Sequence, residues 1–288
     1  MRPAPVGAVL VVSLALALAV SLVPASAHAF CRTTTTKPPI PYEPSTQGCW
    51  TEGTPLAWES GAHVAYSISA GASAQVDLAD ATRVAQLAFA SWNSATCASG
   101  TTPDIQFYDG GPVSVDAAAN DCGLIQCDPT FHDPQHVIVF DDAHWPHNDP
   151  QSTLALTTVT YGVNSGEIYD ADMEINTAQH TISPDEPPPA GAYDLQAIMT
   201  HEAGHFLGLA HATDTHSIMY SQYQPGAITL TQDDVDGLCT IYPHPAAKAG
   251  CACEAAPAGS GTLAMGAWAA LGLAVGLRRA RRRRGTSG

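Results

Sequence analysis

The stretch from His201 to His211 constrains the fold of this 288-residue chain more than any other feature, because its polar residues are spaced to meet at one point. His201 and His205 are four residues apart, so on a helix both imidazoles project from one face. Gly208 allows the backbone to leave the helix, and the turn brings His211 back as a third nitrogen ligand. Three protein ligands leave the fourth position of a Zn2+ ion to water, as in catalytic zinc sites. Glu202, beside the first histidine, is then the candidate base for that water.

The residues before and within this stretch predict a helix. Asp194 is a suitable N-cap. Apolar residues follow it at helical spacing: Leu195, Ile198, Met199, Ala203, Phe206 and Leu207. An ordinary amphipathic helix is the alternative, but it explains neither Gly208 nor His211 in register. Downstream, Met219 lies in the segment Ser217–Tyr220, where zinc peptidases of this type place a methionine-containing turn below the metal. We therefore interpret the pattern as a zinc site.

The chain resembles the metzincin peptidases and, among them, the matrixins, the family of the matrix metalloproteinases. Beyond the zinc pattern, the resemblance rests on Tyr220 directly after Met219 and on the segment Leu230–Tyr242. Matrixins close their catalytic domain with a helix of similar sequence. Astacins and serralysins have a zinc-reaching tyrosine at the position where this chain has Ser221. The resemblance covers residues 56–243.

This resemblance implies both a fold and an activity. The implied fold class is α+β: a metzincin or zincin-like catalytic domain with a twisted mixed sheet packed on long helices, and the active-site helix under the cleft. The implied activity is that of a zinc-dependent endopeptidase acting on extracellular proteins or peptides. In it, His201, His205 and His211 bind Zn2+. Glu202 is the general base and Met219 forms the Met-turn. We expect the protein to be a monomer.

Both ends of the chain carry targeting features. Residues 1–29 are typical of a secretory signal peptide, with an apolar run and a small-residue cleavage site. A membrane-spanning helix is the weaker alternative, because the apolar run is short. Residues 246–288 contain a short cysteine motif, an apolar helix and an arginine-rich tail. They resemble the myxobacterial sorting signal MYXO-CTERM, and a plain stop-transfer anchor is the alternative. Between these ends we expect an arm or linker at 30–55 and a catalytic domain at 56–245.

The expected location follows from these two ends. The protein is exported, and it lies at the cell surface or outer envelope, or outside the cell after C-terminal processing. Membrane contact is expected only through the C-terminal segment, which would be its one transmembrane helix if it is retained.

Removing both ends makes the chain strongly acidic. Residues 30–253 hold four of the 11 Lys and Arg residues and 26 of the 27 Asp and Glu residues, a net charge of −22. Phosphate binding needs clustered Lys and Arg, so this balance argues against nucleic acid and anionic lipid as partners.

Six cysteines lie in the body of the chain, an even number that is typical of disulfide bonds in an exported protein. Cys122 and Cys127 can close a local loop, and Cys31 with Cys49 can tie down the arm. By elimination, the third pair is then Cys97 with Cys239. The arm lacks the cysteine motif with which matrixin propeptides cap the zinc, so a disulfide is favoured over a cysteine switch at positions 31 and 49.

Periodicity along the chain predicts the remaining elements. The candidate strands are 64–68, 105–108, 137–140, 154–161 and 168–176. A helix is expected after Asp77, with Asp80 in its first turn. Its buried stripe is expected to be Ala81, Val84, Ala85, Ala88 and Trp92. A closing helix begins after Thr231, with Asp234 reaching back to the cap. This order matches the matrixin fold, in which strand 154–161 is the edge of the sheet beside the cleft and residues 220–228 are the cleft's other wall.

The strand at 168–176 has an acidic face formed by Asp170, Asp172 and Glu174. A structural Ca2+ ion is one interpretation, because Ca2+ requires several oxygen ligands. A solvated surface is the commoner one. Four histidines, His132, His136, His144 and His147, lie in the preceding region. Their spacing does not match the structural zinc loop of vertebrate matrixins, so we expect surface histidines.

Two other function classes compete with the enzyme. A catalytically idle, zinc-containing surface binding module would be expected to have lost Glu202 or one of the three histidine ligands, and all are present. A structural or adhesive envelope protein is not favoured, because the chain shows one domain and no repeats.

Overall fold

The computed structural model describes residues 29–115 and 136–245. The predicted signal peptide except for Ala29, the loop with Cys122 and Cys127, and the C-terminal segment 246–288 lie outside the described residues. The chain divides into two compact units, and the first ends at Pro245. No helix in the described part is long and apolar enough to cross a membrane.

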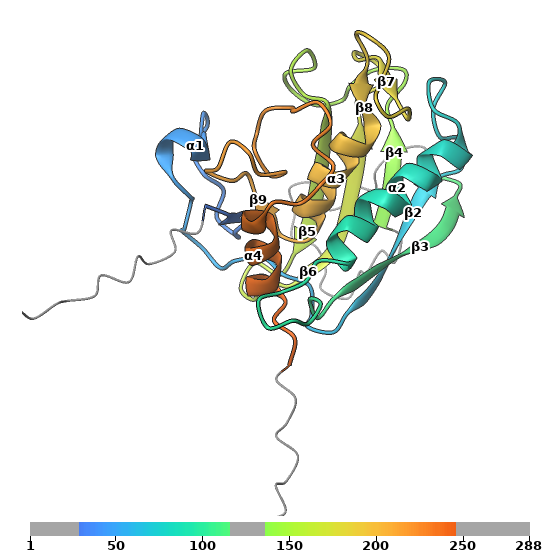
Figure 1. Ribbon diagram of the computed structural model, residues 1–288. Coiled ribbons are helices and arrows are strands. Elements are labelled where there is room, and N and C mark those ends of the chain that lie inside the picture. Colours follow the sequence, from blue (N-terminus) through green and yellow to red (C-terminus); the bar gives the residue numbers. More distant parts are fainter. Residues whose placement is uncertain (1–28, 116–135, 246–288) are drawn as a thin grey trace, which may run out of the picture. The chain divides into compact units, whose positions relative to one another are not determined.

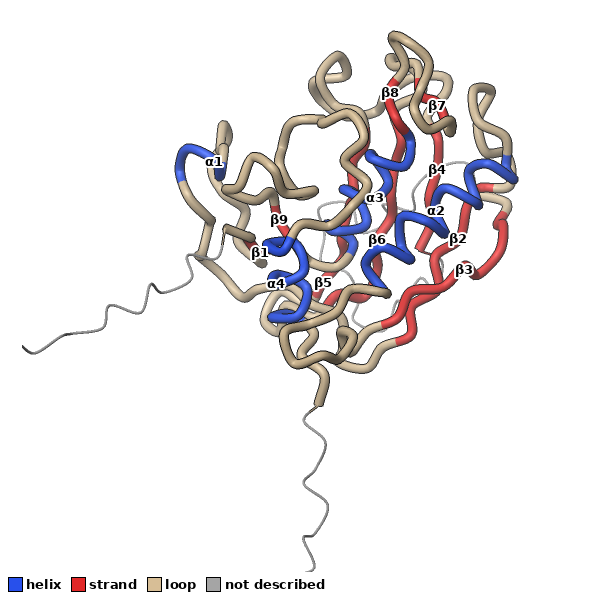
Figure 2. Tube along the Cα trace, viewed as in Figure 1, coloured by secondary structure: helices blue, strands red, loops and turns tan. Residues whose placement is uncertain are grey.

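The centre of the described fold is a mixed five-stranded sheet (Figure 2). Its strands, in spatial order, are β3 (Gln106–Val113), β2 (His63–Ser69), β4 (His136–Phe140), β6 (Ile168–Ile175) and β5 (Ala155–Tyr161). All neighbouring pairs are parallel except β5 with β6, which are antiparallel. The five predicted strands are therefore confirmed, and the segment predicted to be the cleft edge is an edge strand.

Two long helices, α2 (Leu78–Asn93) and α3 (Leu195–Phe206), lie on the same face of this sheet (Figure 1). The Asp77 side chain caps α2 by accepting a hydrogen bond from the Asp80 amide, as predicted. The five predicted stripe residues of α2 are buried, together with Phe89. The indole of Trp92 donates to the Thr200 carbonyl at 2.9 Å, which joins the end of α2 to the middle of α3.

An aromatic cluster fixes the end of α3 against the sheet. Phe206, the last residue of the helix, packs edge-on to Phe89 and Phe107, with ring centroids 5.4 and 5.5 Å apart. Tyr66 of β2 stacks on Phe89 at 4.2 Å. The indole of Trp58 donates to the Phe206 carbonyl at 2.7 Å, which satisfies a carbonyl that the helix end leaves without a partner. Aromatic pairs add about 0.5–1.5 kcal/mol each to their area burial, so α3 ends at a rigid point.

Short elements complete the described fold. β7 (Ile182–Ser183) and β8 (Tyr193–Asp194) form a parallel pair that leads into α3. β9 (Leu209–Ala210) follows α3 and pairs antiparallel with β1 (Cys31–Arg32). A four-residue helix, α1 (Pro44–Gln47), lies in the segment that the sequence predicts to be an arm. The last helix, α4 (Gln232–Ile241), has the predicted capping box between Thr231 and Asp234.

Two of the three predicted disulfides are confirmed. Cys31 and Cys49 are joined across 18 residues of the arm. Cys97, in the loop after α2, is joined to Cys239 of α4. The second bond closes 142 residues of chain, and in the chain-entropy model a loop of that length stabilises the native state by roughly 4–5 kcal/mol.

The acidic face of β6 differs from the expected solvated surface. Asp170, Asp172 and Glu174 are all buried, with 8%, 2% and 3% of their surface exposed. His136 contacts Asp170 at 2.7 Å and His147 contacts Glu174 at 2.8 Å. The prediction of a solvated face is therefore wrong, and so is the prediction of a surface position for His136. The physical reason is that imidazoles on β4 and in the loop after it cover the carboxylates.

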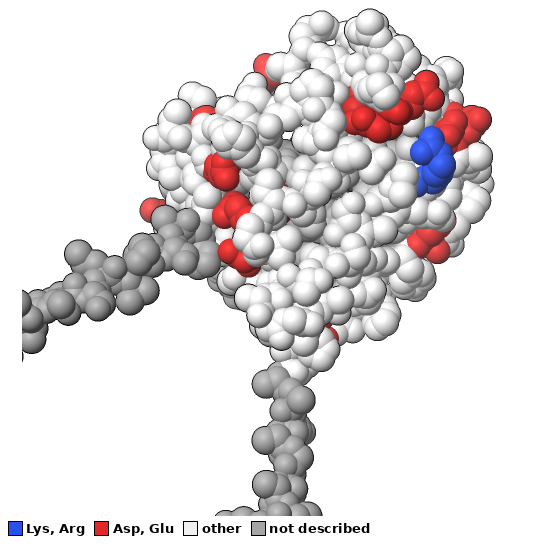
Figure 3. All heavy atoms as spheres, viewed as in Figure 1, with Lys and Arg blue, Asp and Glu red and all other residues white. Residues whose placement is uncertain are grey.

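Elsewhere the surface is acidic, as the composition predicts. On the face drawn in Figure 3, Asp and Glu side chains occur in several places, whereas Lys and Arg gather in one. This distribution offers no extended basic patch on that face for a polyanion.

Candidate active site

The three histidines of the sequence pattern converge in the structure. His201 and His205 lie one turn apart on α3, and His211 follows β9. Their nearest ligand nitrogens all lie within 4.8 Å of one another, which is close enough to share one metal ion. Within residues 29–115 and 136–245, this is the only such group of three or more metal-binding side chains.

Backbone carbonyls orient two of these imidazoles. Nδ1 of His201 lies 2.7 Å from the Ile218 carbonyl, and Nδ1 of His205 lies 2.9 Å from the Leu209 carbonyl. A carbonyl oxygen only accepts hydrogen bonds, so both Nδ1 atoms carry the hydrogen and both Nε2 atoms present a lone pair. Thr33 of the arm donates to the same Leu209 carbonyl at 2.9 Å. The arm therefore contacts the same backbone carbonyl that orients His205.

Burial keeps His205 and His211 neutral. It lowers the pKa of His205, and the nearby His201 lowers it further. Burial also lowers the pKa of His211 to about 2, with additional effects from the other two imidazoles. A histidine binds metal only in its neutral form. Three converging nitrogen donors, two of them with a fixed orientation, fit a zinc ion, whose catalytic sites use three protein ligands.

Gly208 makes the position of His211 attainable. Its φ angle is +89°, a left-handed conformation that residues with a Cβ seldom adopt. A Cβ atom at this position would also lie 2.7 Å from the Leu56 carbonyl oxygen. The chain can therefore turn sharply after α3 and pass close to another backbone segment, as the sequence predicts.

Met219 lies directly below the helix that carries the histidines. A Cβ atom added at Gly204 would collide with the Met219 sulfur and would lie 2.9 Å from the Trp92 ring. Met219 itself is 1% exposed. The glycine between Glu202 and His205 therefore lets the methionine side chain pack against the backbone of α3.

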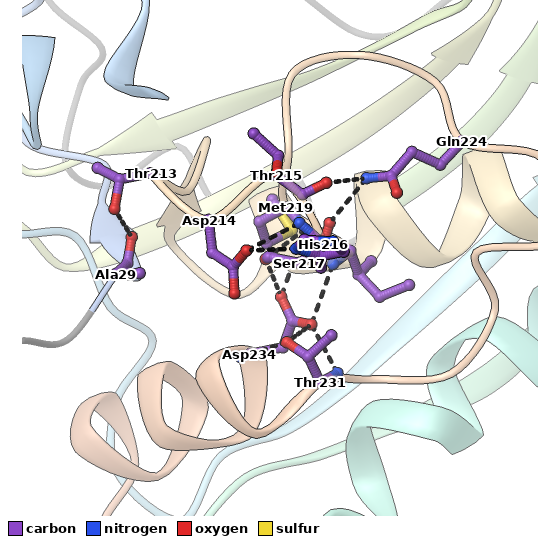
Figure 4. Close-up of polar contacts among 11 residues, drawn as sticks. Ala29, Thr213, Asp214, Thr215, His216, Ser217, Met219, Gln224, Thr231 and Asp234 are labelled. Atoms are coloured by element: carbon purple, nitrogen blue, oxygen red, sulfur yellow. Dashed lines mark hydrogen bonds and ion pairs between the residues drawn. The ribbon is translucent and has the colours of Figure 1, made fainter. Parts of the chain in front are cut away.

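Asp234 holds this turn from the side of α4 (Figure 4). Its carboxylate is 1% exposed and accepts hydrogen bonds from the amides of Thr231, at 2.8 Å, and Ile218, at 3.0 Å. It also accepts from the Ser217 hydroxyl and, at 3.3 Å, from the Met219 amide. The sequence pattern predicts the capping contact, but it contains no signal for the link to the turn.

Glu202 faces the cleft beside the histidines and is 6% exposed. The hydroxyl of Thr157, on edge strand β5, donates to its Oε2 atom at 2.7 Å. The same hydroxyl lies 3.2 Å from the backbone carbonyl of Glu202. Thr157 thus fixes both the side chain and the local backbone. Sequence analysis missed it, since a threonine in an alternating strand has no spacing relation to the zinc pattern.

His201, His211 and Glu202 line a cleft of about 600 Å3. One side of the cleft contains residues next to and at the start of β5, and the other contains the segment after Met219. Its lining residues on that second side are Tyr220, Ser221, Gln222, Tyr223, Gln224 and Ala227. The two predicted walls are confirmed. Ala197, one turn before His201, also lines the cleft.

Comparison with known proteins gives the family. Residues 57–243 match a family model described as Matrixin. The chain is 42% identical to metalloendoproteinase 1 of Glycine max over 57 residues, which are 19% of each chain. It is 49% identical to interstitial collagenase of Bos taurus over 51 residues, which are 17% of this chain and 11% of the relative. It is 31% identical to matrix metalloproteinase-20 of Homo sapiens over 101 residues, which are 34% of this chain and 19% of the relative.

These alignments span less than one fifth of each relative's length. The family model spans well over half of this chain and includes both α3 and α4. The mixed sheet with helices on one face agrees with the fold class that the sequence predicts. The chain therefore belongs to the matrixin family, whose members are zinc-dependent metalloendopeptidases.

Proposed function

We propose that this protein is an exported zinc-dependent endopeptidase that hydrolyses peptide bonds of extracellular proteins. His201, His205 and His211 are the proposed zinc ligands, and Glu202 is the proposed general base. The observation that carries this proposal is the convergence of three imidazole nitrogens beside a cleft lined by His201, His211 and Glu202.

The residues around the cleft suit peptide hydrolysis. When bound, zinc supplies Lewis acidity, which polarises the scissile carbonyl and lowers the pKa of a water molecule to around 7. Glu202 takes the proton from the attacking water and later delivers it to the leaving amine. Thr157 holds Oε2 of this carboxylate at 2.7 Å, so the base keeps its orientation through both transfers.

The substrate we propose is an extended peptide segment. Among the described residues β5 is an edge strand, so its outer side can pair with a strand added from a substrate. Leu154 and Ala155, at the start of this edge, line the cleft together with Glu202. A side chain of the peptide would enter between α3 and the segment after Met219. The small side chain of Ala197 leaves that entry open.

The remaining proposals concern location and ions. We propose that residues 1–29 direct export and that residues 246–288 direct sorting to the cell surface, with the peptidase domain at 56–245 between them. A structural Ca2+ ion remains a prediction. The carboxylates of Asp170 and Glu174 already have imidazole partners, and Asp172 accepts the Val137 amide at 2.8 Å, so these three acids do not require one.

A zinc-containing binding module without activity is the second candidate. Metal content and cleavage together separate the two. The purified protein should bind about one Zn2+ per chain and cleave an unfolded protein, and a chelator should abolish cleavage until zinc is restored. His205→Ala should lose metal and activity together, because two ligands hold zinc weakly. A zinc-loaded, folded protein that cleaves no unfolded protein would favour the binding module.

A further inference from the structure

The arm, residues 30–55, reaches the wall of the cleft through one side chain. The carboxylate of Glu43 accepts a hydrogen bond from the Ser221 hydroxyl at 2.7 Å, across 178 positions of sequence. Its other oxygen accepts from the amide and the hydroxyl of Ser45, at 3.2 and 3.0 Å. Glu43 is thus the N-cap of α1 and at the same time a partner of the cleft wall. Figure 1 shows α1 beside the loop that follows α3.

Ser221 belongs to a wall that has little structure of its own. Residues 220–228 form neither a helix nor a strand. Side chains anchor the segment instead. The Tyr223 hydroxyl accepts from the Asp194 amide at 2.9 Å, and the Gln224 amide group donates to the Thr215 carbonyl at 2.8 Å. Tyr223 also packs edge-on against Tyr193, with ring centroids 5.0 Å apart. The hydrogen bond from Ser221 to Glu43 adds an anchor of a different kind, because it joins this wall to the arm.

The arm is itself held firmly enough to serve as a support. β1 pairs with β9, and the Thr33 amide donates to the Gly208 carbonyl at 2.9 Å. The Cys31–Cys49 disulfide joins β1 to the chain just after α1. The piece of arm between the two cysteines, which includes Glu43, is therefore fixed at both of its ends.

We propose that Glu43 is a positioning residue for the proposed peptidase: it fixes the cleft wall through Ser221, and the Cys31–Cys49 disulfide holds it in place. The arm then sets the fit of the cleft to the peptide side chain that lies against the wall. This inference rests on the proposed function. It predicts an effect on substrate affinity and on the choice of cleavage site, because Ser221 lines the cleft and Glu43 touches no reacting group.

Steady-state kinetics on a peptide substrate test the proposal. Glu43→Ala should raise KM about three- to tenfold, which is the range for losing one ordinary, partly exposed hydrogen bond, and should change kcat less than about twofold. It should also shift cleavage-site preference in an unfolded protein. Glu43→Gln keeps an acceptor and should recover part of the KM. Glu52→Ala is the matched control: it removes the same charge from an exposed position in the arm and should leave both constants unchanged.

Two further measurements separate a positioning role from a general loss of active, folded enzyme. Ser221→Ala should raise KM in the same direction, and the double variant Glu43→Ala with Ser221→Ala should be no worse than the more affected single variant. Mass mapping should find the Cys31–Cys49 bond intact in each. A merely structural role would lower the fraction of active enzyme, which reduces apparent kcat and leaves KM unchanged.

Specific results would overturn the inference. They are an unchanged KM and site preference in Glu43→Ala, a fall in kcat alone, or additive effects in the double variant. These outcomes leave the proposed function intact if the parent protein still cleaves peptides. Replacing both cysteines of the arm by serine gives a second route. This variant should raise KM as Glu43→Ala does, even where the alanine variant fails to form α1, and an unchanged KM would count against the proposal.

Discussion

Glu202 and Asp234 are two buried carboxylates near the proposed metal site, but their surroundings differ. The oxygens of Asp234 accept hydrogen bonds from backbone amides on two segments and from the hydroxyls of Ser217 and Thr231. Glu202 accepts a hydrogen bond from Thr157 and lines the cleft. An acid enclosed by donors stabilises the fold, because removing it leaves those donors unsatisfied. An acid that faces a cleft is available to a substrate or a water molecule.

The largest expected effect is on activity. Glu202→Gln nearly preserves the shape of the side chain but removes the proton acceptor, so the cleavage rate should fall by ~10²–10⁴. Zinc content and thermal unfolding should stay at the parent's values, since the three histidines are unchanged. Undiminished cleavage of peptides by this variant would make the proposed mechanism wrong.

Asp234→Ala should instead lower the stability of the folded protein. The buried donors on the Met219 turn and the first turn of α4 lose their common acceptor, so the free energy of unfolding should fall by about 3–5 kcal/mol. Denaturant unfolding measures this loss. Asp236→Ala is the control on the same helix. There the carboxylate accepts from the Gln232 side chain at 2.8 Å in an exposed contact, and the loss should stay within about 0.5 kcal/mol.

Thr157→Val tests the hydrogen bond that orients Glu202. It removes the hydroxyl that holds Glu202 while it nearly preserves the volume of the side chain. One hydrogen bond to a charged group is worth about 1.5–3 kcal/mol, so kcat/KM should fall roughly 10- to 150-fold. Thr157→Ser keeps the hydroxyl and should restore most of the activity. Equal activity in the valine and serine variants would show that the hydrogen bond does not orient the base.

Asp141 is a third case, with the smallest expected effect. Burial, and then the charge of Glu174, raise its pKa from 3.8 to about 6. Its Oδ2 atom is buried and has no hydrogen-bond partner among the described residues. The folded state therefore binds this proton more tightly than the unfolded state, so this group's contribution to stability decreases as the pH rises from about 4 to about 6.

Asp141→Asn removes that charge. It should raise the free energy of unfolding at pH 7 by less than about 1 kcal/mol after solvent screening, with a slightly higher Tm, and should have little effect below pH 4. Thermal unfolding at several pH values measures the difference. A destabilised Asn variant at pH 7 would mean that the ionised carboxylate has a favourable partner.

The amino-acid sequence by itself determined the parts of the site whose geometry is local. Four-residue spacing on a helix places His201 and His205 on one face, whatever the rest of the chain does. Gly208 marks the turn that leads to His211, and the φ angle of +89° there is of the kind that favours glycine. Strand alternation and capping residues predicted the five strands and the starts of α2, α3 and α4, because these signals also lie within a few residues of each other.

Tertiary structure alone decided the contacts between segments that are distant in sequence. Thr157 meets Glu202 across 45 positions, and Asp234 meets Ser217 across 17. The acids of β6 are buried because His136 and His147 happen to pack over them. Periodicity tells which face of an element is apolar, but not which other element will cover its polar face. Such pairings depend on how the whole chain packs, and they determine which buried carboxylates are enclosed by donors and which one faces the cleft.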